Sequence, residues 1–333
     1  MKQVLWLSQA DVFQTGICSI ASAVPVVERA FKLFEDKKAV IAQEVGLRWN
    51  PDGSDQACYA LPAWVGGEFE VSGLKWSAHG PASNLERGVS RIHASIILND
   101  PVTGEPFVMM NGTDIGAVRT GAVTAVALKK LAPKQARKAA LCGAGAQAER
   151  QLQALLYAMP GLQEIAVWSR GGVKNVLLAD RYAGQSRILI RPAASLEDAA
   201  DGADILIGAT SAPSPYIVEA VLKSVSLYCH IGFHEISFEA LSLFKNVYVD
   251  TWDDAKNVSG QSLFRMYRQG LFPQERLSGC LGALVAGKLR ASRAVPSEKT
   301  MFDAFGLPIF DVSLAKEAFS RAKAAGLGQL MDW

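Results

Sequence analysis

The sequence lacks the features that mark several classes of protein. Neither charge is in clear excess, because 34 Lys and Arg residues stand against 32 Asp and Glu residues, a formal net charge of +2. Without a basic run or an acidic tail, no nucleic acid or anionic membrane is expected as a partner. No stretch of about 18 apolar residues occurs, which argues against a membrane span. The N-terminus has no apolar signal segment, so we expect a cytoplasmic protein.

Cysteine and histidine are scarce, and their spacing argues against cysteine-based and metal sites. The five cysteines are far apart and form no C-x-x-C pair. We expect buried thiols in a reducing compartment rather than a disulfide framework or a zinc site. His230 and His234 lie four residues apart, but the segment reads as a strand followed by a loop. The two rings therefore need not share a face, and we expect no metal.

The 333 residues, half of them hydrophobic, are enough for two domains. Residues 24–36 have helical periodicity, and β-like runs at 58–61, 71–76 and 94–98 are separated by turn clusters such as 50–53. This part predicts an α+β region with an antiparallel sheet. A helix over 120–131 then leads into strands at 138–142, 164–168, 187–190, 204–208, 225–231 and 246–250, with helices between several of them. A last helix is expected over 311–327.

The alternating middle part predicts an α/β fold with a doubly wound parallel sheet. Its first turn reads Gly143-Ala-Gly145-Ala146-Gln147-Ala148, between a strand and a helix. This is the setting of a Rossmann dinucleotide site, in which the helix N-terminus faces a pyrophosphate and Ala can take the place of the third glycine. We therefore predict a Rossmann domain over 119–308, inserted into a substrate-binding and dimerisation domain formed by 1–118 and 309–333.

Further cofactor contacts are expected outside this turn. Thr120 is predicted to open a helix near the pyrophosphate, and Thr210 and Gly232 follow sheet strands whose ends face the cofactor. After the strand 164–168, where an NAD enzyme usually has an acid for the ribose 2′-hydroxyl, the chain has Ser169 and Arg170. An arginine there suits a 2′-phosphate. We predict that NADP(H) is preferred over NAD(H).

Several motifs together resemble the ornithine cyclodeaminase/μ-crystallin family. They are R-T-G-A at 119–122 followed by the glycine turn, G-L-K-W at 73–76, I-I-L-N-D-P-V-T-G at 96–104 and F-D-A-F-G at 302–306. The resemblance runs nearly from end to end. Within the family it is greatest to the siderophore-pathway branch, which releases 2,3-diaminopropionate from an N-(2-amino-2-carboxyethyl)-glutamate adduct. The resemblance implies a homodimer acting on a small amino or imino acid.

The resemblance also implies which residues carry the chemistry. Lys75 and Arg119 match positions that hold the substrate carboxylate, and Lys75 is also a catalytic candidate. Arg48 is a further candidate clamp, while Arg91 would suit a substrate with an additional carboxylate or would lie on the surface. Glu235 falls on the position of the family's acid–base Asp.

These residues predict an NAD(P)-dependent oxidoreductase acting on the C–N bond of an amino or imino acid, namely an imino acid reductase or an amino acid dehydrogenase. Three alternatives stay open. One is oxidative cleavage of the adduct to 2,3-diaminopropionate and 2-oxoglutarate. The second is an ornithine cyclodeaminase, and the third is a non-catalytic NADPH-dependent binding protein.

Overall fold

The computed structural model describes residues 2–49, 56–84, 87–291 and 293–333; the predicted turn at 50–53 lies outside these residues. The chain divides into two compact units. The first consists of Met1–Arg119 with Leu307–Trp333, and the second of Thr120–Gly306.

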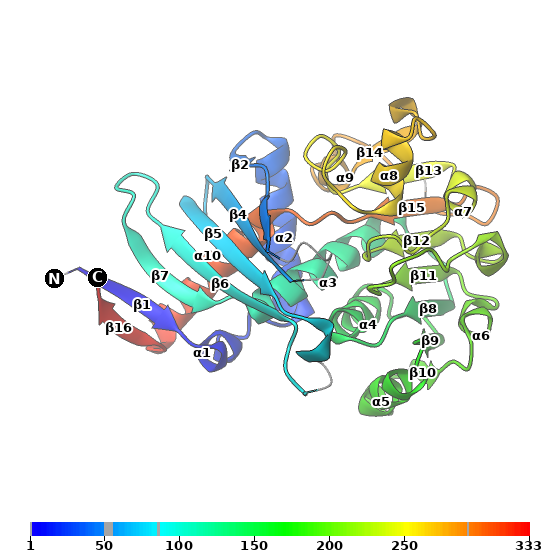
Figure 1. Ribbon diagram of the computed structural model, residues 1–333, viewed down its shortest axis with the longest axis horizontal. Helices are drawn as coiled ribbons and strands as arrows, with labels where there is room; N and C mark the ends of the chain where they lie inside the picture. Colours follow the sequence, from blue (N-terminus) through cyan, green and yellow to red (C-terminus); the bar gives the residue numbers. More distant parts are fainter. Residues whose placement is uncertain (1, 50–55, 85–86, 292) are drawn as a thin grey trace. The chain divides into compact units, whose positions relative to one another are not determined.

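The first unit is built on an eight-stranded sheet (Figure 1). The strands run in the order β16-β1-β7-β6-β5-β4-β2, and β3 pairs with β4. The three predicted strands, in β4, β5 and β6, pair antiparallel as expected. The sheet is mixed because β1, which was not predicted, pairs with β7 in parallel. The strands are β1 (Gln3–Leu7), β2 (Ala39–Ile41), β3 (Val45–Arg48), β4 (Ala57–Val65), β5 (Val71–His79), β6 (Ile92–Asn99), β7 (Pro106–Asn111) and β16 (Gln329–Asp332).

Helices α2 (Ile20–Glu35) and α10 (Pro308–Ala325) pack together and against the sheet of the first unit, and α1 (Gln9–Gln14) lies beside them. The rings of Phe31 and Phe310 meet edge to face, 4.6 Å between centroids. Helix α10 begins with Pro308, whose missing N–H costs nothing in a first turn, and ends at Gly326 in the left-handed conformation. Its first half, from Pro308 to Ala315, is buried, so α10 contributes much of the core of this unit.

The second unit contains a parallel sheet in the order β10-β9-β8-β11-β12-β15-β13-β14 (Figure 1). The strand order reverses between β8 and β11, which creates the crevice at which doubly wound folds bind nucleotides. The strands are β8 (Lys138–Cys142), β9 (Glu164–Trp168), β10 (Leu189–Pro192), β11 (Ile205–Gly208), β12 (Leu227–His230), β13 (Asn246–Val249), β14 (Leu277–Cys280) and β15 (Thr300–Asp303). The helices are α4 (Ala146–Ala158), α5 (Val173–Tyr182), α6 (Leu196–Ala200), α7 (Phe238–Ser242), α8 (Ser262–Arg268) and α9 (Leu281–Val285). The predicted doubly wound sheet is confirmed.

Helix α3 (Thr113–Leu131) begins before the predicted start at Thr120. The side chain of Asn111 accepts a hydrogen bond from the backbone N–H of Thr113, which starts the helix there. Thr120 therefore lies inside the helix and does not open it. Strands β14 and β15 were not predicted.

No helix among the described residues is both long enough and apolar enough to span a membrane. Of the five cysteines, Cys18, Cys142 and Cys229 are buried, whereas Cys58 and Cys280 are only partly so.

Candidate functional site

A buried ion cluster lies within the first unit. The ammonium of Lys75, on β5, donates to Oδ2 of Asp311 at 2.8 Å. Nε of Arg119, on α3, lies 3.6 Å from the same oxygen. The carboxylate of Asp311 is fully buried, and Lys75 is 5% exposed. Burial lowers the pKa of Lys75, Asp311 pulls it upwards, and the net direction is down.

The other two predicted substrate-binding arginines act on the same neighbourhood. Burial lowers the pKa of His79, and the charges of Arg91, Lys75 and Arg48 lower it further. Arg48 donates to the hydroxyl of Tyr59 at 2.8 Å, and the Tyr59 ring lies against His79. Nε of Arg91 lies 3.3 Å from the backbone oxygen of Gly80, to which it donates.

A second carboxylate, that of Glu44, interacts with the cluster electrostatically from a partly exposed position. Partial burial raises its pKa, although the charges of Lys75, Arg119 and Arg48 act in the opposite direction. The four predicted cations therefore gather in one electrostatic neighbourhood with two carboxylates, Asp311 and Glu44. Such a neighbourhood can hold a small anion, because a guanidinium fork and an ammonium together offset the desolvation of a carboxylate.

Asp311 and Glu44 were not predicted as site residues. The signal for Asp311 was available, since an acid within the apolar stretch of α10 must find a cation when it is buried. Its partner could not be inferred from the sequence, because Lys75 lies 236 positions away. Nothing in the sequence distinguishes Glu44 from a surface residue.

The turn between β8 and α4 requires its glycine. Gly143 has a φ of +122°, and a Cβ there would lie 2.5 Å from the backbone oxygen of Ala209. Ala148 is fully buried, consistent with close packing of the helix on the sheet. Gly145 caps α4 without a side-chain hydrogen bond, and the space around it is open. This leaves room for an anion at the helix N-terminus.

The same turn fits a dinucleotide in a further respect. Ala146 opens α4, and the next residue, Gln147, has a buried Nε2 with no hydrogen-bond partner among the described residues.

Ser169 and Arg170 follow β9, and Arg170 is exposed. Because the Arg170 side chain is exposed, its guanidinium is available to a ligand.

Glu235 is fully buried, and its carboxylate ties together two loops at the end of the sheet. Oε1 accepts hydrogen bonds from the backbone N–H of Thr210 at 2.7 Å, from the Thr210 hydroxyl, and from the Tyr216 hydroxyl at 2.9 Å. Oε2 accepts from the N–H of Gly232 at 3.1 Å. A Cβ at Gly232 would lie 2.3 Å from this carboxylate, so only glycine allows the approach. The structure thus brings Thr210, Gly232 and Glu235 together.

Behind Glu235 lies a second buried pair. Nδ1 of His230 is 2.8 Å from Oδ2 of Asp303, and Nε2 of His230 is 3.9 Å from Glu235. Burial alone lowers the pKa of His230, but Asp303 and then Glu235 outweigh it, so that the pKa is raised. An imidazolium between two carboxylates accounts for this direction.

This direction predicts how stability depends on pH. The unfolded histidine has a pKa of about 6.5, and the folded pKa is higher, so the stabilisation is complete below about pH 6.5 and is lost as the pH rises through the folded value. His230→Gln should therefore lower the free energy of unfolding more at pH 6 than at pH 9, measured by urea titration. His93→Gln, which removes an exposed imidazole, is the control. If the loss of unfolding free energy caused by His230→Gln instead grew with pH, the raised pKa of His230 would be contradicted.

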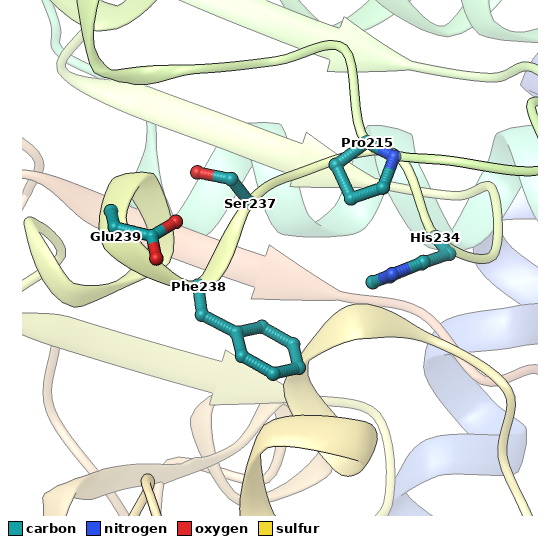
Figure 2. Close-up of a pocket in the computed structure, with 5 residues that line it drawn as sticks. All are labelled: Pro215, His234, Ser237, Phe238 and Glu239. Atoms are coloured by element: carbon teal, nitrogen blue, oxygen red, sulfur yellow. The ribbon is translucent and has the colours of Figure 1, made fainter.

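A small pocket of about 210 Å³ lies in the second unit beside this network. Figure 2 shows the rings of Pro215, His234 and Phe238 around it, with Ser237 and Glu239 at the start of α7. Nδ1 of His234 is 2.9 Å from the hydroxyl of Ser262. Burial, with the charges of Arg265 and His230, lowers the pKa of His234. His230 and His234 thus have different partners, and no group of three metal-binding side chains occurs among the residues described.

The sequence profile of the ornithine cyclodeaminase/mu-crystallin family matches residues 4–326. The chain belongs to this family. It is 25% identical over 334 residues to the N-((2S)-2-amino-2-carboxyethyl)-L-glutamate dehydrogenase of Staphylococcus aureus, covering 99% of both chains. The predicted family is confirmed.

Solved structures of family members are also similar. The Thermococcus litoralis Delta(1)-pyrroline-2-carboxylate reductase, in complex with NADH and L-proline, is 29% identical, with a TM-score of 0.89 over 98% of this chain and 99% of that one. An archaeal alanine dehydrogenase dimer with bound NAD is 26% identical, with a TM-score of 0.89 over the whole of both chains.

Proposed function

We infer that the protein is a nicotinamide-dependent oxidoreductase that acts on the C–N bond of an amino or imino acid. The observation that carries this inference is the buried cluster of Lys75 and Arg119 around Asp311, which offers two cations to a small carboxylate. The same chain has a glycine turn of the kind that binds a dinucleotide, and a nicotinamide dinucleotide is the redox group that this reaction needs. The related reductases and dehydrogenases support the same class of reaction.

We propose that the first unit binds the substrate carboxylate through Arg119 and Lys75, with Arg48 as a further clamp. The second unit holds the cofactor through the 143–148 turn, Ser169, Arg170, Thr210 and Gly232. Thr120, which lies inside α3, is proposed to lie near the cofactor without opening a helix toward it. A bound nicotinamide supplies a hydride to, or accepts one from, the substrate α-carbon. Reduction of an imine then needs one proton on nitrogen.

Glu235 is proposed to act on that proton indirectly. Its carboxylate is buried, but it accepts hydrogen bonds from the hydroxyls of Thr210 and Tyr216. Burial raises the pKa of Tyr216, which keeps this hydroxyl protonated. These contacts support a role for Glu235 in orienting the two hydroxyls and exchanging a proton through them.

We propose a preference for NADP(H) over NAD(H), because the exposed guanidinium of Arg170 follows β9 where an acid would repel a 2′-phosphate. Arg170→Ala should weaken NADPH binding about ten- to a hundredfold, the loss expected for a charge-assisted hydrogen bond. NADH binding should change less than threefold. Calorimetric titration with both cofactors checks this, and equal losses for the two would contradict the role of Arg170.

The activity is tested by supplying NADPH with a panel of cyclic and acyclic imino acids, and NADP⁺ or NAD⁺ with amino acids. Turnover of an imino acid with NADPH supports the reductase. The positive charges of Arg91 and Arg48, both of which act on His79, favour a second candidate, a substrate with additional carboxylates. For this candidate, oxidation of an N-(2-amino-2-carboxyethyl)-glutamate adduct and hydrolysis of the resulting imine would yield 2,3-diaminopropionate and 2-oxoglutarate. Product analysis separates the two.

We further propose a cytoplasmic homodimer. One face of the sheet in the first unit carries α2 and α10, whereas paired residues on the other face form an apolar row across the strands. Leu74 pairs with both Pro62 and Ile97, and Ile97 pairs with Met109, and all four are only partly buried. Next to this row, Trp76 is 42% exposed. A second copy would cover such a face.

The variant Leu74→Glu/Ile97→Glu should be monomeric in sedimentation velocity experiments in which the unmodified protein sediments as a dimer. Two carboxylates in the middle of an apolar interface carry a desolvation cost that the dimer cannot offset. Leu330→Glu, an exposed position on the edge strand β16, is the control and should leave the dimer intact. A dimer that survives the double substitution would place the interface elsewhere.

A further inference from the structure

Asn175, in the first turns of α5, joins three segments of the second unit. It is 2% exposed. Its Nδ2 donates to the backbone oxygen of Val167 at 3.2 Å and to that of Ala193 at 3.0 Å. Its Oδ1 accepts from the hydroxyl of Ser169 at 3.2 Å. Asn175 therefore connects the ends of β9 and β10 to the turn in which the cofactor ribose is proposed to lie.

These contacts determine which way the Ser169 hydroxyl points. The amide of Asn175 cannot be reversed, because Oδ1 would then face two carbonyl oxygens. Oδ1 therefore needs a donor, and Ser169 provides it. A serine hydroxyl has one proton and two lone pairs, so Ser169 can still accept a hydrogen bond but has no second proton to donate. Turning the hydroxyl away would leave a buried acceptor unsatisfied, which is unfavourable.

We propose that Asn175 determines cofactor specificity by holding Ser169 as a hydrogen-bond acceptor for the ribose 2′-hydroxyl of NAD(H), which leaves the 2′-phosphate of NADP(H) to Arg170. This rests on the proposed cofactor site. A 2′-hydroxyl can donate to Ser169, whereas an ionised 2′-phosphate has only acceptors. The two cofactors are thus recognised by adjacent residues, and NAD(H) stays an accepted ligand although Arg170 favours NADP(H).

The backbone around these residues leaves space for either group. Neither Gly171 nor Gly172 would place a Cβ within 4 Å of another atom, and Gly172 has a φ of +69°. The N–H of Gly172 donates to the oxygen of Ser169 at 3.1 Å, which closes the turn. Arg170 lies in this turn and is exposed, while Ser169 is half-buried against Asn175.

The first test compares the affinities of NADH and NADPH for the intact protein and for Ser169→Ala by calorimetry. NADH should bind about three- to tenfold more weakly, the loss of one ordinary hydrogen bond, and NADPH within twofold of the original affinity. Ser169→Thr, which keeps a hydroxyl, should restore NADH binding. Ser186→Ala, which removes a hydroxyl that bonds to Ile188 within its own turn, should change neither. Equal weakening of both cofactors by Ser169→Ala overturns the proposal.

The second test repeats the Ser169→Ala comparison in an Asn175→Ala background. Without the Asn175 acceptor, the Ser169 hydroxyl is free to donate to the 2′-phosphate. Ser169→Ala should therefore weaken the binding of NADPH as well as the binding of NADH in this background. A purely structural Asn175 would instead lower the thermal midpoint and leave the effect of Ser169→Ala unchanged, which overturns the proposal. If the Asn175→Ala protein does not fold, the first test still decides. An unmodified protein that binds neither cofactor overturns the proposed function itself, and the inference with it.

Discussion

Replacing Arg119 by alanine should lower kcat/KM for the amino or imino acid substrate by about 10²- to 10³-fold. Truncating one partner of a buried, hydrogen-bonded charge pair costs about 2–5 kcal/mol, and 1.4 kcal/mol corresponds to a factor of ten. The Arg119 side chain is only 14% exposed, so water cannot replace the lost guanidinium well. Steady-state kinetics over a range of substrate concentrations measure the effect.

Two further variants separate charge from geometry. Arg119→Lys keeps the positive charge but loses the planar fork, so its kcat/KM should lie between those of the original protein and of Arg119→Ala. Arg321→Ala removes an arginine that pairs with Glu317 on α10, outside the ion cluster, and it should retain full activity. Cofactor affinity should be unchanged in all three. A kcat/KM within threefold of the original for Arg119→Ala would show that another group holds the carboxylate.

The parts of the fold that the sequence predicted best are those that are determined locally. Strands β8 and β9 begin and end at the predicted residues because each is a short apolar run bounded by turn residues. The start of α3 was placed too late, because its first turns contain Gly116 and a mixture of polar residues. The pairing of β1 with β16 joins the two ends of the chain, and no local pattern reports such a contact.

The ion cluster shows a different limit. Its four cations come from β3, β5, the segment before β6 and α3, so no spacing in the sequence links them. The family resemblance implied roles for Lys75 and Arg119, but none for the Asp311 that holds them. In the second unit the position of Glu235 was predicted, whereas its burial and its four hydrogen bonds were not. Both carboxylates arrange other groups, and this role follows from contacts rather than residue type.

Two buried acids, Asp250 and the Asp303 of the F-D-A-F-G motif, also arrange the end of the parallel sheet. Asp250, after β13, accepts hydrogen bonds from the backbone N–H groups of Phe305 and Gly306 after β15. Asp303, at the end of β15, holds His230 at the end of β12. These two acids therefore join the carboxyl ends of three strands. Their place beside the proposed cofactor crevice explains why they occur with the glycine turn without contributing a catalytic group.

Asp311→Ala should lower the free energy of unfolding by about 3–5 kcal/mol, the usual result of removing one partner from a buried ion pair. Lys75 and Arg119 would be left as two buried cations without their shared carboxylate. Urea titration measures the change, with the midpoint shifting and the slope unchanged. Asp332→Ala removes an acid on the exposed strand β16 and should cost little.

The double variant Lys75→Met/Asp311→Leu tests whether the loss comes from the unpaired charge. Replacing a buried ion pair by apolar side chains is often nearly neutral, so this protein should be more stable than Asp311→Ala, although it lacks both charged groups. Its activity should nevertheless be lost, because the ammonium proposed to face the substrate carboxylate is gone. Stability losses that simply add would mean that the two residues act independently. Recovery of stability without activity would instead identify the cluster as a feature that the fold tolerates and the chemistry requires.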